Sequence, residues 1–336
     1  MPGTDPVEAM RIVMGELPDL PHLAELPGRG VGADLTGRTA GLLVDLPVET
    51  TPAGWRFAGR PGRDLSRARG LLAADLDALE ETAAGYRGPL KIQVCGPWSL
   101  AATIELARSQ DPALADPGAM TDLTESLAEG TAAHLDEVRK RVPGARVLLQ
   151  LDEPALPAVL AGGVPTASGL NRVPTPEPAD AEARLAAVIG AAEAAFTLIH
   201  CCGRPVPFGM IKAVGAGAVG FDLGLLRREE EDGLAGAVEA GLGILAGVVP
   251  ATAPDTARPA GAGPLPDPGV TARRVVGLWR RMGWPAAPGA GRGGAAGQIV
   301  LTPACGLAGA SPGYARAALA HCREAARLLP ELIEEG

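Results

Sequence analysis

Short apolar runs alternate with longer amphipathic segments along almost the whole chain. Runs rich in leucine and β-branched residues predict strands at residues 41–46, 90–95, 146–151, 196–200, 218–223, 243–249 and 298–303. Apolar residues at helical spacing predict helices at residues 5–17, 65–84, 121–141, 179–194, 206–214, 228–240, 269–282 and 312–328. Because the strands are apolar almost throughout, the pattern favours a parallel sheet that is covered on both faces.

The order of these elements favours an α/β fold of the TIM (β/α)8 barrel type. The chain opens with a helix and shows one strand fewer than such a barrel needs. We therefore expect the first strand to be missing or reduced to a stub at Met1. We expect residues 1–336 to form a single barrel domain.

Composition and charge narrow the classes of partner. The chain has 336 residues, is 47% hydrophobic and carries a formal net charge of −9, with no basic block that could neutralise phosphates. This argues against nucleic acid or an anionic membrane surface as a partner. The apolar window at 241–254 is short, glycine-rich and broken by Pro250, and the first ten residues contain no apolar signal core. These features predict a cytoplasmic protein.

The five cysteines are odd in number and unevenly spread, which is not the pattern of a disulfide framework. Polar or reactive residues follow the predicted strands in the stretches "CGPWSL", "LDEPAL", "HCCG", "FDLG" and "TPACGL". In a parallel barrel the carboxyl ends of the strands meet on one face, where catalytic groups lie. We therefore expect these five stretches to lie together.

Within that face, His200, Cys202 and Cys305 form a predicted metal set. Imidazole and thiolate ligands together favour zinc, and a catalytic site uses three protein ligands plus an open position. Residues 200 and 202 would point the same way on a regular strand, with Cys201 pointing oppositely. The alternative is that these residues are small buried side chains and a hydrogen-bonded histidine.

Asp152 and Glu153 end an otherwise apolar strand. Carboxylates at the floor of a pocket can pair with a cationic ligand group such as an α-ammonium. The alternative is that one of them caps the helix that begins near Pro154.

Together these residues resemble the cobalamin-independent methionine synthase family, specifically its zinc-bearing C-terminal barrel. "LLQLDEPAL" is similar to that family's strand end of the form Q-hydrophobic-DEPA, "IHCCG" to its His-x-Cys pair and "TPACGL" to its P-x-CGL motif. "GPWSLA" resembles a turn in the same fold. The resemblance covers residues 90 to 328 and extends more faintly to the barrel group that holds uroporphyrinogen decarboxylase and corrinoid-dependent thiol methyltransferases.

The resemblance implies methyl transfer to the sulfur of homocysteine, which gives methionine. It implies Zn2+ as cofactor, with His200, Cys202 and Cys305 as ligands. The family has a glutamate as its remaining ligand, and the corresponding strand here offers Asp222, which is one methylene shorter.

The resemblance also assigns the substrate side of the site. Asp152 would hold the amino group of homocysteine and act as the catalytic carboxylate. Glu153 would help to bind the substrate, and Trp98 would line the donor site unless it belongs to the core. The methyl donor would be methyltetrahydrofolate or a methyl-corrinoid.

Two other functions stay open. One is a corrinoid-dependent methyltransferase of the same barrel group that acts on another small thiol. The other is a non-catalytic zinc-binding or thiol-binding protein. Metal content helps to separate them, because a purely structural zinc site is closed by four protein ligands.

Overall fold

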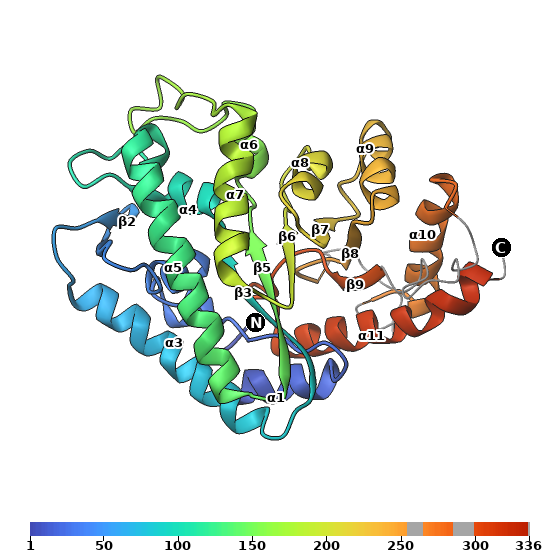
Figure 1. The fold of residues 1–336 in the computed structure, drawn as a ribbon. Coiled ribbons are helices and arrows are strands. Elements are labelled where there is room, and N and C mark those ends of the chain that lie inside the picture. The colour runs from blue at the N-terminus through green and yellow to red at the C-terminus, as the bar shows by residue number, and fades with distance from the viewer. Residues whose placement is uncertain (254–264, 285–298, 335–336) are drawn as a thin grey trace.

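A curled sheet of six parallel strands forms the centre of the protein (Figure 1). The computed structural model describes residues 1–253, 265–284 and 299–334. The strand order is β3-β5-β6-β7-β8-β9, and every neighbouring pair is parallel. The strands are β3 (Gly88–Cys95), β5 (Ala145–Asp152), β6 (Phe196–His200), β7 (Ala218–Asp222), β8 (Gly243–Val249) and β9 (Ile299–Pro303). Six of the predicted strands are confirmed, and so is the parallel α/β arrangement.

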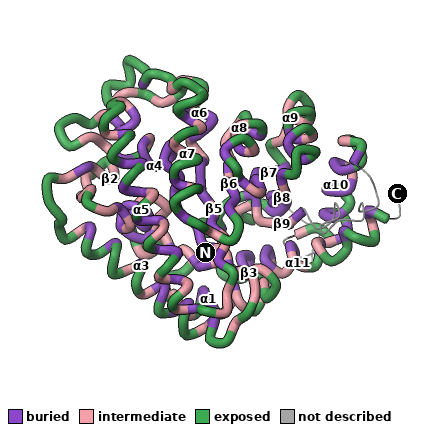
Figure 2. The backbone as a smooth tube through the Cα atoms, in the orientation of Figure 1, coloured by how far each residue is buried: buried purple, intermediate pink, exposed green. Residues whose placement is uncertain are grey.

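Helices surround the outer side of this sheet, and neighbouring helices pack in the pairs α1–α3, α5–α7 and α10–α11. The helices are α1 (Pro6–Glu16), α2 (Leu35–Ala40), α3 (Arg63–Thr82), α4 (Pro97–Thr103), α5 (Pro117–Arg141), α6 (Leu156–Leu160), α7 (Pro178–Ala192), α8 (Phe208–Ala213), α9 (Arg228–Glu239), α10 (Pro268–Arg281) and α11 (Pro312–Glu334), with short 3-10 turns at Pro27–Arg29 and Ala113–Ala115. Figure 2 shows buried positions on the strands and exposed positions on the outward sides of the helices. None of the described helices combines the length and the apolar character that crossing a membrane requires.

An Asp-Pro pair starts three of these helices. Asp5, Asp116 and Asp267 precede the first residues of α1, α5 and α10, and each carboxylate accepts a hydrogen bond from a backbone N–H of the first turn. The proline that follows needs no hydrogen-bond partner there, because it has no N–H. These local contacts fix where the three helices begin.

The two faces of β3 differ in polarity. Leu90, Ile92 and Val94 are buried in the main apolar core, whereas Lys91 and Gln93 line the interior cavity described below. Successive side chains of a strand point to opposite faces, so the polar residues lie on the inner face. The expectation of strands that are apolar on both faces is therefore wrong for β3.

The segment at residues 41–46 is not a strand, contrary to the sequence prediction. The segment forms a turn that is packed into the core, where Leu43 is fully buried, and this explains its apolar residues. Asp45 has a left-handed backbone (φ 51°), and Pro47 follows it, so the segment cannot continue as a regular strand. A separate small sheet of order β1-β2-β4 contains β1 (Val48–Thr51), β2 (Gly54–Phe57) and β4 (Ile104–Glu105).

The main sheet is a half-barrel, so the expected closed eight-stranded barrel is not what the described residues form. The stub of an additional strand lies at His22, which forms one parallel bridge with Lys91, and not at Met1. Pro18, Pro21 and Pro27 surround this bridge, and proline removes the N–H that a longer ladder would need.

Candidate functional site

Two strand ends bring one imidazole and two thiols together. His200 is the last residue of β6, Cys202 follows in the next loop, and Cys305 lies two residues after β9. Their ligand atoms all lie within 4.8 Å of one another. The Sγ atoms of Cys202 and Cys305 are 4.0 Å apart, although the residues are separated by 103 positions.

Backbone pairing and two glycines place these side chains. The carbonyl oxygen of His200 accepts the N–H of Glu153 at 2.8 Å, which continues the β5–β6 ladder to the site. A Cβ at Gly220 of β7 would lie 2.9 Å from Nδ1 of His200, so the glycine makes room for the ring. A Cβ at Gly247 of β8 would lie 2.7 Å from Cα of Ala304, so this glycine admits the segment before Cys305.

The thiols differ in acidity. Hydrogen bonding to Cys202 and then to His200 lowers the pKa of the Cys305 thiol to about 4. The same contact with Cys305, followed by burial, raises the pKa of Cys202. The pair of thiols therefore releases its first proton more readily than an isolated thiol does, and its second proton less readily. Burial raises the pKa of Cys201 to about 12, so this thiol stays protonated.

The donor set fits zinc. With Zn–S bonds of about 2.3 Å, two thiolates on a tetrahedral ion lie about 3.8 Å apart. The observed Sγ–Sγ distance of 4.0 Å is close to this value. One imidazole and two thiols would leave the fourth position to another ligand or to substrate.

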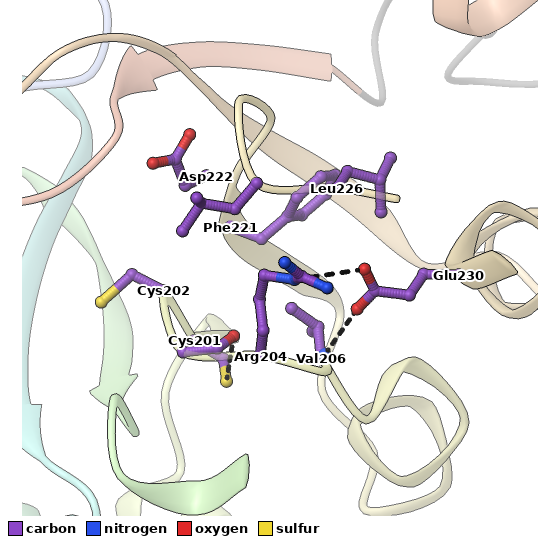
Figure 3. Close-up of a pocket in the computed structure, with 10 residues that line it drawn as sticks. Cys201, Cys202, Arg204, Val206, Phe221, Asp222, Leu226 and Glu230 are labelled. Atoms are coloured by element: carbon purple, nitrogen blue, oxygen red, sulfur yellow. Dashed lines mark hydrogen bonds and ion pairs between the residues drawn. The ribbon is translucent and has the colours of Figure 1, made fainter. Parts of the chain in front are cut away.

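Asp222 lies outside this group of ligand atoms in the part of the chain that the structure describes. It ends β7, and its Oδ1 accepts the N–H of Gly224 at 2.7 Å, as in an Asx turn. Asp222 at the end of β7 and Cys202 in the loop after β6 line the same small space (Figure 3). Asp222 would have to leave the Gly224 N–H to become a ligand.

A cavity of about 810 Å³ adjoins the His–Cys–Cys group, whose three members form part of its wall. Polar residues that line it include Glu25, Lys91, Gln93, Gln150 and Asp152. All five residues of β9 also line the cavity. Since one face of a strand shows only alternate residues, the cavity runs along the edge of β9.

Asp152 is the carboxylate of the cavity that the sequence predicts. It is paired with His200 across the β5–β6 ladder, and Nε2 of Gln150 donates to its Oδ1 at 2.7 Å. Burial raises the pKa of Asp152 to about 6, and the nearby charge of His200 opposes that rise. The group can therefore be neutral or ionised near neutral pH.

Glu25 is a second cavity carboxylate, which the sequence reading missed. Its Oε1 lies 3.3 Å from Nε of Arg38, and its carbonyl oxygen accepts the amino group of Met1 at 2.6 Å. The sequence signal for Glu25 is only a single acidic residue within the stretch "HLAELPGR". Lys91 and Gln93 left a clearer signal, because they alternate with apolar residues in "LKIQVC".

Glu153 and Trp98 are not among the residues that line the cavity. Glu153 is fully buried; its Oε1 accepts the N–H of Trp98 at 2.9 Å, and its Oε2 accepts the N–H and hydroxyl of Ser99 at 2.8 and 2.7 Å. It therefore caps α4 and not the helix after Pro154. The indole N–H of Trp98 donates to the carbonyl of Ala181 at 3.1 Å, which makes Trp98 a core residue.

Neither a protein-family model nor a curated protein matches this sequence. The structure is similar to a solved B12-independent methionine synthase from Shewanella sp. W3-18-1 in complex with selenomethionine, with a TM-score of 0.59 over 97% of this chain and 88% of that chain. The two sequences are 12% identical. At this identity the likeness is one of fold, and the protein shares the curled α/β architecture of a methionine synthase.

Proposed function

We propose that the protein is a zinc-dependent S-methyltransferase that transfers a methyl group to the thiolate of homocysteine and so forms methionine. The observation that carries this proposal is the grouping of His200, Cys202 and Cys305 in the wall of a cavity that also contains Asp152 and Glu25. The methionine synthase neighbour supports the same reaction type through its fold.

Different residues would bind the thiol end and the ammonium end of the substrate. His200, Cys202 and Cys305 would hold zinc, which when bound would supply the charge that keeps a substrate thiol deprotonated at neutral pH. Asp152 and Glu25 would receive the substrate ammonium. Lys91 is a cation near Asp152, and Arg38 pairs with Glu25, so the ammonium would join carboxylates that already have cationic neighbours.

A metal assay tests the first part of the proposal. The purified protein should contain about one zinc per chain, and Cys305→Ser or Cys202→Ser should remove most of it. Cys322→Ala is the matched control, because Cys322 is a buried thiol on α11 outside the ligand group. Full zinc content in Cys305→Ser, measured by mass spectrometry, would contradict the assignment.

We also propose Asp222 as an acidic ligand, because it ends β7 and lines the same small space as Cys202. Asp222→Asn keeps an oxygen that can accept the Gly224 N–H but removes the charge. It should lower zinc affinity at least tenfold in a chelator competition. Unchanged affinity would leave Asp222 as a turn residue only.

The methyl donor would be methyltetrahydrofolate or a methyl-corrinoid. Since the cavity is larger than homocysteine and follows the edge of β9, we expect the reactive part of a bulky donor to enter it. Methionine formation with methylcobalamin should be at least as fast as with the monoglutamate folate. Turnover with folate alone would refute the corrinoid expectation. Intact zinc with no turnover from either donor would favour another thiol acceptor or a non-catalytic role.

A further inference from the structure

One buried carboxylate joins the loops that follow β6 and β7. Glu230 is the third residue of α9, and its side chain is 9% exposed. Its Oε1 accepts the N–H of Val206 at 3.3 Å, and its Oε2 accepts the N–H of Arg227 at 3.0 Å. Oε2 also lies 3.4 Å from Nε of Arg204. Figure 3 shows Arg204 and Val206 between the two cysteines and Glu230.

These contacts reach both loops that carry proposed ligands. Arg204 and Val206 lie two and four residues after Cys202, and Arg227 lies five residues after Asp222. Cys202, Asp222 and Glu230 line one small space. A shift of Glu230 would therefore move both loops relative to each other.

We infer that Glu230 is a positioning residue for the metal site, which holds the Cys202 loop in the geometry that binds the ion. This inference rests on the proposed function. Without the carboxylate, the Val206 N–H and the Arg204 guanidinium would lose their acceptor, and the Arg204 Nε is already buried without a well-aligned hydrogen bond. Such supporting contacts orient metal ligands, and their loss lowers metal affinity.

A purely structural role would involve only α9. Oε2 of Glu230 accepts the backbone N–H of Arg227, the residue before α9, and this contact stabilises the start of the helix. That contact does not account for those with Val206 and Arg204. The two roles differ in what they predict, because a cap affects stability while a positioning residue also affects the affinity of the folded protein for metal.

The neighbouring residue Glu231 offers a matched control. It has the same charge and lies in the same helical turn, but it pairs with Arg281 of α10 at 2.7 Å. Replacing it removes an acidic side chain from the start of α9 and leaves the contacts of Glu230 in place.

The experiment compares wild type, Glu230→Ala, Glu230→Gln and Glu231→Ala. Zinc affinity is measured by competition with a chromophoric chelator, the Co²⁺ charge-transfer band reports thiolate ligation, and urea unfolding of the metal-free proteins reports stability. Glu230→Ala should bind zinc about 10- to 100-fold more weakly, with a weaker Co²⁺ band. Glu230→Gln, which retains one acceptor oxygen, should fall in between. Glu231→Ala should stay within twofold of wild type.

Two results would overturn the inference. One is a folded Glu230→Ala with wild-type zinc affinity, which reduces Glu230 to a helix cap. The other is an equal loss of zinc affinity in Glu231→Ala, which would mean that removing any acidic charge near the start of α9 has the same effect. If Glu230→Ala does not fold, the comparison of Glu230→Gln with Glu231→Ala decides in the same way. Absence of zinc binding by wild type would instead refute the proposed function itself.

Discussion

Asp152→Asn should make the metal-free protein more stable at neutral pH while it weakens the binding of an amino-acid thiol. Asparagine has nearly the same shape and keeps the oxygen that accepts the Gln150 N–H. It removes only the charge, in a position where Asp152 is 8% exposed. The variant therefore isolates the cost of ionising this carboxyl inside the cavity.

The size of the effect follows from the pKa. Burial raises the pKa of Asp152 from 3.8 to about 6; the charge of Glu25 adds to the rise, and those of His200 and Lys91 oppose it. The pKa of Asp152 is higher in the folded protein than in the unfolded protein. Its contribution to the free energy of unfolding is therefore fully present below about pH 4 and is lost as the pH rises through about 6. Each pKa unit corresponds to about 1.4 kcal/mol, so the free energy of unfolding of wild type falls by about 3 kcal/mol between pH 4 and pH 8.

Urea unfolding of both metal-free proteins at several pH values measures this difference. Asp152→Asn should match wild type near pH 4 and exceed its free energy of unfolding by about 2–3 kcal/mol at pH 8. Asp122→Asn, which changes an exposed carboxylate on α5, is the control and should show no such trend. A difference between Asp152→Asn and wild type that does not change with pH would refute the reasoning.

The same substitution tests the substrate role of Asp152. With zinc bound, homocysteine should bind about 2–4 kcal/mol more weakly to Asp152→Asn, because its ammonium loses a buried partner. A thiol of similar length without the amino group should bind equally to both proteins in the same calorimetric titration. An equal loss for both thiols would show that Asp152 does not contact the ammonium.

Two further predictions concern buried carboxylates away from the proposed ligands. Glu153→Ala should lower the free energy of unfolding by about 3 kcal/mol, since three donors at the start of α4 lose their acceptor, and Glu153→Gln should lose less. Equal losses in the two variants, measured by urea unfolding, would contradict this. Asp75→Asn should lower the free energy of unfolding by about 3 kcal/mol, because Asp75 is the buried partner of both Arg29 and Arg38. Glu81→Gln changes an exposed ion pair and should lower the free energy of unfolding by less than about 1 kcal/mol in the same assay. A similar loss in Asp75→Asn and Glu81→Gln would argue against a special role for the buried ion pairs.

The sequence by itself determined the order of strands and helices. Six of the predicted strands and all of the predicted helices appear in the structure, because the spacing of apolar residues is a local signal. It also indicated which reactive residues would meet. The carboxyl ends of parallel strands converge whatever the details of packing, so His200, Cys202 and Cys305 could be grouped without coordinates.

Only the tertiary structure decided which apolar run was a strand and which carboxylate faced the cavity. Residues 41–46 have the composition of a strand but are buried as a turn, and burial by distant neighbours leaves no periodic trace. Asp152 and Glu153 are adjacent, yet one lines the cavity and the other caps α4. Glu25 lines the cavity and pairs with Arg38, and Glu230 contacts the loop after Cys202 through Val206; these contacts join residues 13 and 24 positions apart. Such roles depend on how the loops pack, which no local pattern encodes.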